Sequence, residues 1–133
     1  ENVAGGRGIT EKTAGQLFDG GIDVFTSGNH LWDKKDSLEY IASEKRILKP
    51  INYPPDALGA QYFIKTISPG NTLAIVSLIG QAFITTADSP LFSLKKLLPQ
   101  LHNHTEKILV DFHAEATAEK RALGLYFDGQ ISA

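Results

Sequence analysis

The chain has 133 residues, of which 42% are hydrophobic and 21% are charged, so it can bury one core and one domain is expected. Its 13 Lys and Arg nearly balance 15 Asp and Glu, which excludes a strong nucleic-acid patch, and the lack of cysteine excludes disulfides, zinc-thiolate sites and thiol catalysis. No apolar run is long enough to span a bilayer, so we expect no membrane association and a cytoplasmic location.

The first third of the chain predicts a helix followed by a strand. Residues 10–20 have the apolar spacing of a helix, with Thr10 as the N-cap and Gly20 as the stop. Residues 22–27 are rich in β-formers and predict a short strand.

The middle third predicts a helix and a hairpin. The helix is expected to start at Asp33 or Asp36 and to run through Ser43. Two extended runs, 61–67 and 72–79, are separated by a Ser-Pro-Gly-Asn turn and predict a β-hairpin.

The last third alternates helix and strand. Residues 91–101 predict a helix despite Pro99, residues 107–113 predict a buried strand, and residues 116–127 predict an Ala- and Leu-rich helix. Residues 129–133 predict a turn that enters a further strand. This order predicts an α/β domain with a mixed sheet.

The first candidate site is Asn29-His30, which follows the strand predicted at 22–27. Ligands of α/β sheets gather beyond the carboxyl ends of strands, where an amide oxygen can bind a metal and an imidazole can bind a metal or transfer a proton. Taken alone, the dipeptide is explained more simply as a turn that caps the next helix.

His113 is the second candidate, at the end of the strand predicted at 107–113. Its small neighbours permit close approach of a metal or phosphate, and Asp111 or Glu115 could orient its imidazole. A single histidine at a strand end is more often satisfied by packing, so the position gains weight only from coinciding with Asn29-His30.

Other polar groups are weaker candidates. Glu1 and Asn2 precede a glycine-rich run that lacks the Lys-Ser/Thr ending of a phosphate-binding loop, and a terminal Glu is ordinarily solvated. His102 and His104 are expected in a solvated loop, and Trp32 is expected to pack.

Taken together, four segments resemble the YmdB-type metallophosphoesterases, bacterial relatives of the calcineurin-like phosphoesterases. The resemblance spans nearly the whole chain. The matching segments are Glu1-Asn2-Val3-Ala4-Gly5-Gly6 with Gly8-Ile9-Thr10, Gly28-Asn29-His30-Leu31-Trp32-Asp33-Lys34-Lys35, Asn52-Tyr53-Pro54, and Asp111-Phe112-His113-Ala114-Glu115-Ala116-Thr117 with Glu119-Lys120.

The resemblance implies a four-layer α/β/β/α sandwich with a mixed sheet, two divalent metal ions, iron or manganese, and hydrolysis of phosphodiesters such as cyclic nucleotides. By motif, Glu1 resembles the carboxylate that bridges both metals, and Asn29 and His113 resemble ligands of one of them. Asn2 resembles a residue that binds metal or faces the substrate. His30 resembles the proton donor to the leaving alkoxide, a role that suits an imidazole.

Two family features are missing, a strand with a metal-binding Asp and a Gly-Thr-His-Thr-His segment. Because the chain begins at Glu1 and contains no Met, we expect residues 1–133 to be the central part of one longer domain and to be inactive alone. The alternatives are a non-catalytic α/β interaction module that pairs with a partner or a second copy, and a nucleotide-binding domain that holds no metal.

Overall fold

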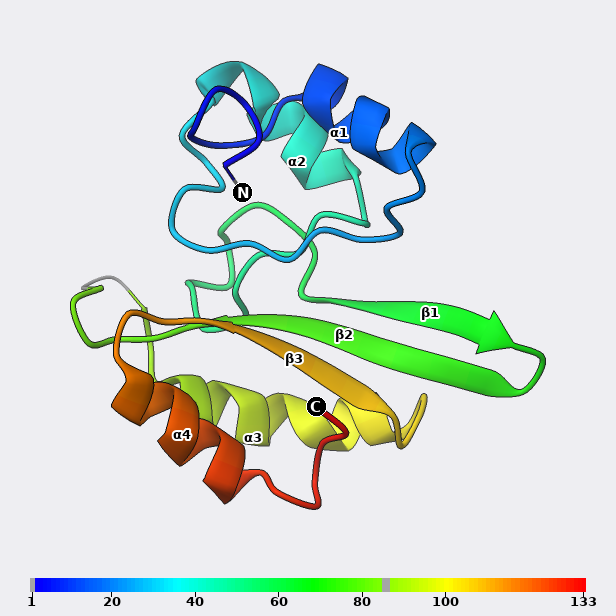
Figure 1. Ribbon diagram of the computed structural model, residues 1–133, viewed down its shortest axis with the longest axis vertical. Helices are drawn as coiled ribbons and strands as arrows, with labels where there is room; N and C mark the ends of the chain where they lie inside the picture. The colour runs from blue at the N-terminus through cyan, green and yellow to red at the C-terminus, as the bar shows by residue number, and fades with distance from the viewer. Residues whose placement is uncertain (1, 85–86) are drawn as a thin grey trace.

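The computed structural model describes residues 2–84 and 87–133 (Figure 1). The protein is a mixed α/β structure, as predicted, and no helix in the described part of the chain has the length and apolarity to cross a membrane. In chain order its elements are α1 (Glu11–Asp19), the 3₁₀ turn η1 (Lys35–Ser37), α2 (Leu38–Ser43), β1 (Tyr62–Ser68), β2 (Asn71–Ile79), α3 (Pro90–His102), β3 (Ile108–His113) and α4 (Thr117–Tyr126).

The three strands form a mixed sheet in the order β1-β2-β3. β1 and β2 are the predicted antiparallel hairpin, and their turn contains Gly70 at a φ of 75°, a backbone conformation that glycine adopts without strain. β2 and β3 are parallel, in a register that pairs Ile79 with His113. The carboxyl ends of both strands therefore lie at the same edge of the sheet.

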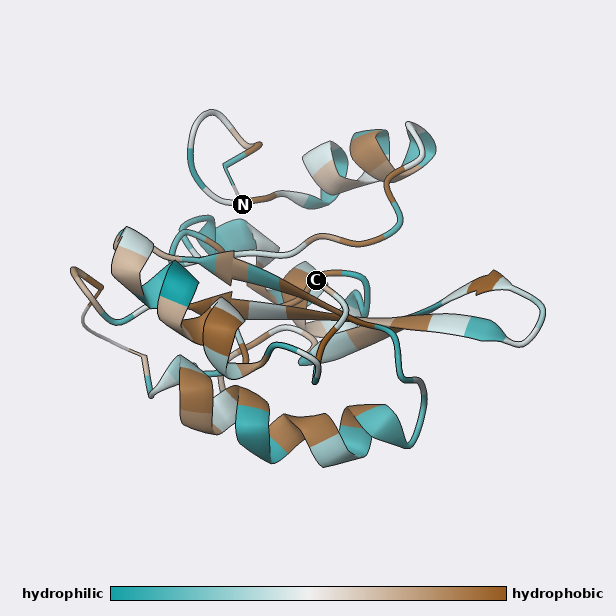
Figure 2. Ribbon diagram, turned by 60° about the horizontal axis from the view of Figure 1, so that its bottom comes forward, coloured by the Kyte–Doolittle hydropathy of each residue, from teal (hydrophilic) through white to brown (hydrophobic). Residues whose placement is uncertain are grey.

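One face of the sheet is covered by α3 and α4, which lie below it in Figure 1. The two helices alternate hydrophobic and hydrophilic residues in Figure 2, as expected for helices with one buried side. This side and the sheet form the main core, whose buried members are Ala74, Val76, Leu78, Leu94, Leu97, Leu98, Leu101, Ile108, Leu123 and Phe127.

A second, smaller core lies under α1 and α2. It consists of Ile9, Ala14, Leu31, Ile41 and Ile47. The predicted Thr10 cap is confirmed, because its hydroxyl accepts from the Thr13 backbone N–H at 3.2 Å.

The strand predicted at 22–27 is wrong. This segment pairs at one point only, a parallel bridge between Phe25 and Ile47. Beyond that point the backbone N–H and C=O of Ser27 are bound by the hydroxyl of Ser77, so a side chain of β2 takes the place of a neighbouring strand.

Two predicted boundaries also differ. The second α-helix begins at Leu38 after the turn η1, and it is capped neither by Asp33, whose carboxylate bonds to His30, nor by Asp36. At the other end, the predicted turn is followed by hydrogen bonds from Ser132 N to Ile108 O and from Val110 N to Ala133 O, at 2.8 Å each, which continue the sheet beside β3.

Candidate functional site

The loop that carries Asn29 and His30 is anchored to β2 by hydrogen bonds between Ser27 and Ser77. The Ser77 hydroxyl accepts from Ser27 N at 3.2 Å and donates to Ser27 O at 2.7 Å. Ser77 is fully buried, so both bonds are shielded from water. The backbone just before Gly28 is therefore held against the strand that runs beside His113.

Asn29 and His113 come together at the carboxyl edge of the sheet. His113 is the last residue of β3, and its carbonyl accepts from Gly80 N at 2.9 Å. Its Nε2 lies 3.1 Å from Asn29 Oδ1, a hydrogen bond in which the imidazole N–H donates. Two side chains that are 84 positions apart in sequence thus lie in hydrogen-bond contact, although the strand predicted before Asn29 is not formed.

His30 is part of the same chain of contacts. Its Nδ1 lies 2.8 Å from Asp33 Oδ2, and its Nε2 lies 3.4 Å from Asn29 Nδ2. Because the Asn29 amide nitrogen can only donate and the carboxylate can only accept, these contacts assign the proton of a neutral His30 to Nδ1. The sequence pattern does not reveal this role of Asp33, although its spacing of three residues from His30 is visible.

The strand ends are fixed by two further polar side chains. Asn52, only 1% exposed, bonds Ile79 on both backbone groups, at 2.7 Å to its O and 3.0 Å to its N. Glu119 of α4 accepts from the backbone N–H groups of Gln81 and Ala82 at 2.8 and 3.2 Å. Asn52 and Glu119 both lie in segments that resemble the family, but their partners could be found only from the tertiary structure.

Gly80 is required between these two supports by close packing. A Cβ on this residue would lie 2.6 Å from Glu119 Oε2 and 2.8 Å from Ala114 Cβ. The end of β2 and the start of α4 therefore approach each other at a distance that only glycine permits.

The other predicted site residues are Glu1 and Asn2, and of these only Asn2 can be placed relative to the cluster. Glu1 lies outside the described residues, and Asn2 is exposed and makes no hydrogen bond to Asn29, His30 or His113 in the described part of the chain. Among residues 2–84 and 87–133, neither Asp111 nor Glu115 hydrogen-bonds His113, so the expectation that one of them orients its ring is not met.

The donor atoms at the edge fit part of a metal site. Asn29 Oδ1 and His113 Nε2 are 3.1 Å apart and are the ligand types that iron and manganese accept. Within the described ranges no group of three or more His, Cys, Asp or Glu is placed to hold a metal ion. The described residues therefore offer two candidate ligand atoms at this edge and no complete metal site.

His102 and His104 lie at the other end of the sheet. The His104 carbonyl accepts from Thr72 Oγ1, at the start of β2, at 3.2 Å. His102 Nδ1 lies 3.0 Å from Glu106 Oε2, an ion-pair distance without hydrogen-bond geometry. Their separation from the carboxyl edge excludes them from the cluster around His113.

Trp32 packs, as predicted. Its Nε1 donates to Leu58 O at 3.0 Å, and its ring meets the Tyr53 ring edge-on, with centroids 4.9 Å apart.

Comparisons with known proteins show the family and the fold of the chain. The family model described as "YmdB-like protein" matches residues 1–133. A 2',3'-cyclic-nucleotide 2'-phosphodiesterase of Bacillus subtilis (strain 168) is 40% identical over 134 residues, which are 100% of this chain and 50% of the relative. The chain spans about half the length of the curated relatives it matches.

Two solved structures share the fold. A hypothetical protein from Thermus thermophilus superposes with a TM-score of 0.87 at 35% identity, over 96% of this chain and 49% of that one. A structure described as a novel phosphatase from Mycoplasma pneumoniae gives a TM-score of 0.88 at 29% identity, over 99% of this chain and 48% of that one.

Proposed function

The chain belongs to the YmdB-like protein family, and on that premise we propose that it carries part of the active site of a phosphodiesterase. This enzyme would use two divalent metal ions, iron or manganese, to hydrolyse phosphodiesters such as cyclic nucleotides. The observation that carries the proposal is the linked set Asp33, His30, Asn29 and His113 at the carboxyl edge of the sheet. The phosphodiesterase name of the Bacillus relative supports the same activity.

Asn29 Oδ1 and His113 Nε2 are the atoms that would hold one of the two metals. In the structure His113 Nε2–H donates to Asn29 Oδ1. Metal binding by Nε2 therefore requires that this nitrogen lose its proton. Divalent ions held here would supply positive charge to the phosphate oxygens and would lower the pKa of a bound water. Glu1, the proposed bridging carboxylate, and Asn2 are the further ligands in this proposal.

His30 is the proton donor in this proposal. When its ring is doubly protonated, Nδ1–H remains bonded to Asp33, but Nε2 can no longer accept from the Asn29 amide. The proton on Nε2 is then available for the oxygen that leaves when the P–O bond breaks. Because a sugar alkoxide is a poor leaving group, its protonation lowers the barrier substantially.

Replacement of His113 in the full-length protein tests the metal assignment. His113→Ala is expected to lower metal content at one site of the pair and to reduce turnover about 10- to 100-fold, with partial recovery in excess manganese or iron(II). Elemental analysis and activity measured against added metal check both parts.

His102→Ala is the matched control, because that histidine lies at the opposite end of the sheet and should leave metal content unchanged. Unaltered metal stoichiometry in His113→Ala would remove His113 from the site, and an unaltered protein that holds no metal would favour the non-catalytic alternative.

A further inference from the structure

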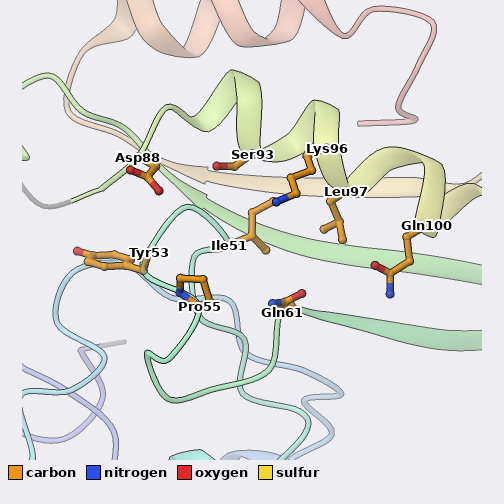
Figure 3. Close-up of a pocket in the computed structure, with 9 residues that line it drawn as sticks. All are labelled: Ile51, Tyr53, Pro55, Gln61, Asp88, Ser93, Lys96, Leu97 and Gln100. Carbon is orange, nitrogen blue, oxygen red and sulfur yellow. The ribbon is translucent and has the colours of Figure 1, made fainter.

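A cavity of about 260 Å³ lies between α3 and the segment from Ile51 to Gln61 (Figure 3). Ile51 and Leu97 give it an apolar floor, and Tyr53 supplies an aromatic wall at one end. Small-molecule sites combine such apolar surfaces with a few polar groups that fix the ligand's orientation.

The polar groups of the cavity are of both kinds, donors and acceptors. Lys96 and Asp88 place opposite charges on its lining, and Gln61 and Gln100 add two amides. Within the described residues the side chains of Lys96, Asp88 and Gln61 have no protein partner, whereas Gln100 Nε2 donates to Tyr62 Oη at 2.9 Å and leaves its oxygen as an acceptor.

The presence of both Lys96 and Asp88 in the lining disfavours binding of a free anion. A phosphate at Lys96 would also face the Asp88 carboxylate, and a purely apolar ligand would desolvate both charges without replacing their bonds to water. A planar, neutral heterocycle that carries both donors and acceptors can bond an ammonium, a carboxylate or an amide without bringing a net charge into the cavity. Nucleobases have that character, and proteins bind them by packing an aromatic ring on the base and hydrogen-bonding its edge.

The cavity is joined to the proposed active site through two neighbouring residues. Asn52 bonds both backbone groups of Ile79, the residue paired with His113. The next residue, Tyr53, packs its ring against Trp32, which lies two positions after His30. Tyr53 therefore contacts both the cavity and the aromatic residue that follows His30 by two positions.

The outer wall of the cavity is preformed. Lys49 is 2% exposed, and its Nζ donates to the carbonyls of Pro54, Pro55 and Ala57 at 3.0, 3.0 and 2.7 Å. These bonds fix the loop that presents Pro55 to the cavity, so binding requires little ordering of the chain.

We propose that this cavity binds the nucleobase of the nucleotide substrate. The inference rests on the proposed phosphodiesterase function for the phosphate, but binding of the base can be measured without hydrolysis.

Adenosine, which has a base and ribose but no phosphate, is the first probe. In the full-length protein, adenosine should bind saturably by calorimetry, and Lys96→Ala combined with Gln61→Ala should weaken it about tenfold or more. Both side chains are exposed, so the variant is expected to fold. Lys95→Ala is the matched control, because Lys95 is the neighbouring residue on α3 and its Nζ lies near Tyr126 Oη instead.

The same variants should differ in kinetics. The double variant should raise KM for 2',3'-cyclic AMP about tenfold while leaving KM for bis-p-nitrophenyl phosphate, which has no base, unchanged. Adenosine that does not bind, or that binds the double variant as tightly as the unaltered protein, would overturn the proposal. Adenosine binding that depends on Lys96 and Gln61 in a protein without hydrolytic activity would uphold the base site and reject the phosphodiesterase function.

Discussion

At the scale of single residues, His30 has a partner on each ring nitrogen, and the two partners have different tasks. Asp33 accepts from Nδ1 at 2.8 Å, and Asn29 faces Nε2 at 3.4 Å. The shorter contact fixes the ring, and in the proposed mechanism the longer one is given up when Nε2 delivers a proton. Asp33 is therefore a positioning residue for His30.

Asp33→Asn in the full-length protein is expected to lower turnover of 2',3'-cyclic AMP about tenfold or more, because a neutral amide holds the ring less well and stabilises its protonated form less than a carboxylate. Turnover of bis-p-nitrophenyl phosphate and metal content should change little. Asp36→Asn, on the adjacent exposed turn, is the control. Equal loss on both substrates would show that Asp33 supports the fold or the metals and not proton transfer.

The sequence locates Asn29, His30 and His113 but not the side chains that hold them. His113 could be located from pattern, because it ends a strand that the structure has, whereas Asn29 and His30 were located by their motif although the strand predicted before them is wrong. The pattern favours Asp33 as a helix cap, since an Asp before a helical run ordinarily has that role. Only the structure shows that its carboxylate turns back to His30.

At the scale of elements, Ser77 connects the central strand to the loop of the site. Both of its bonds to Ser27 are buried. Ser77→Ala is expected to reduce the free energy of unfolding by about 1–3 kcal/mol, because it leaves a buried N–H and C=O unpaired. Metal affinity should fall as well, since Asn29 follows two residues after Ser27.

Denaturant unfolding with metal titration checks this prediction. Ser68→Ala, in the exposed hairpin, is the control and should change stability by less than about 0.5 kcal/mol. A Ser77→Ala protein with unchanged stability and metal affinity would contradict the anchoring role.

The smaller core is supported by an ion pair that responds to pH. Arg46 donates to both Glu44 oxygens, at 2.9 and 2.7 Å, and its guanidinium lies 3.6 Å from the centre of the Phe18 ring of α1. The hydrogen bonds from Arg46 lower the pKa of Glu44. Because the pKa of Glu44 is lower in the folded state than in the unfolded chain, the ion pair stabilises the protein fully above about pH 4.3. This contribution to stability is lost as the pH falls through the lower pKa of the folded state.

Glu44→Gln should therefore reduce stability at pH 7 and flatten the decrease in stability between about pH 4.3 and the lower pKa of Glu44 in the folded state. Thermal unfolding across that range measures the effect. Glu39→Gln, an exposed carboxylate in α2, is the control. If Glu44→Gln lost stability with falling pH as steeply as the unaltered protein, the pair would not be the source of the acid sensitivity.

Most elements were predictable because their signals are local. The hairpin has a Pro-Gly turn, and α1 has its cap and apolar spacing. The strand at 22–27 failed because strand formation depends on a partner, and Ser27 is bound by a side chain. The pattern of apolar residues in 22–27 does not show that the backbone of Ser27 is bonded by a side chain and not by a neighbouring strand.

At the scale of the whole molecule, one face of the sheet is covered and the other is less completely so. Opposite α3 and α4, a cavity of about 490 Å³ is lined by residues that include Leu73, Ile75 and Leu109, and Leu109 is 38% exposed. The four-layer sandwich implied by the family would place a second sheet against this face. That arrangement, and the residues that complete the metal site, stay predictions for this chain.

The central claim is that His30 delivers a proton to the leaving group in a site whose metals are held by other residues. The direct measurement is turnover by His30→Ala in the full-length protein, on 2',3'-cyclic AMP and on bis-p-nitrophenyl phosphate, with metal content determined on the same preparation. We predict a loss of about 10²- to 10⁴-fold on the cyclic nucleotide, a loss below about tenfold on the nitrophenyl ester, and normal metal content. Equal losses on both substrates, or loss of metal, would contradict the account and make His30 a ligand or a structural residue.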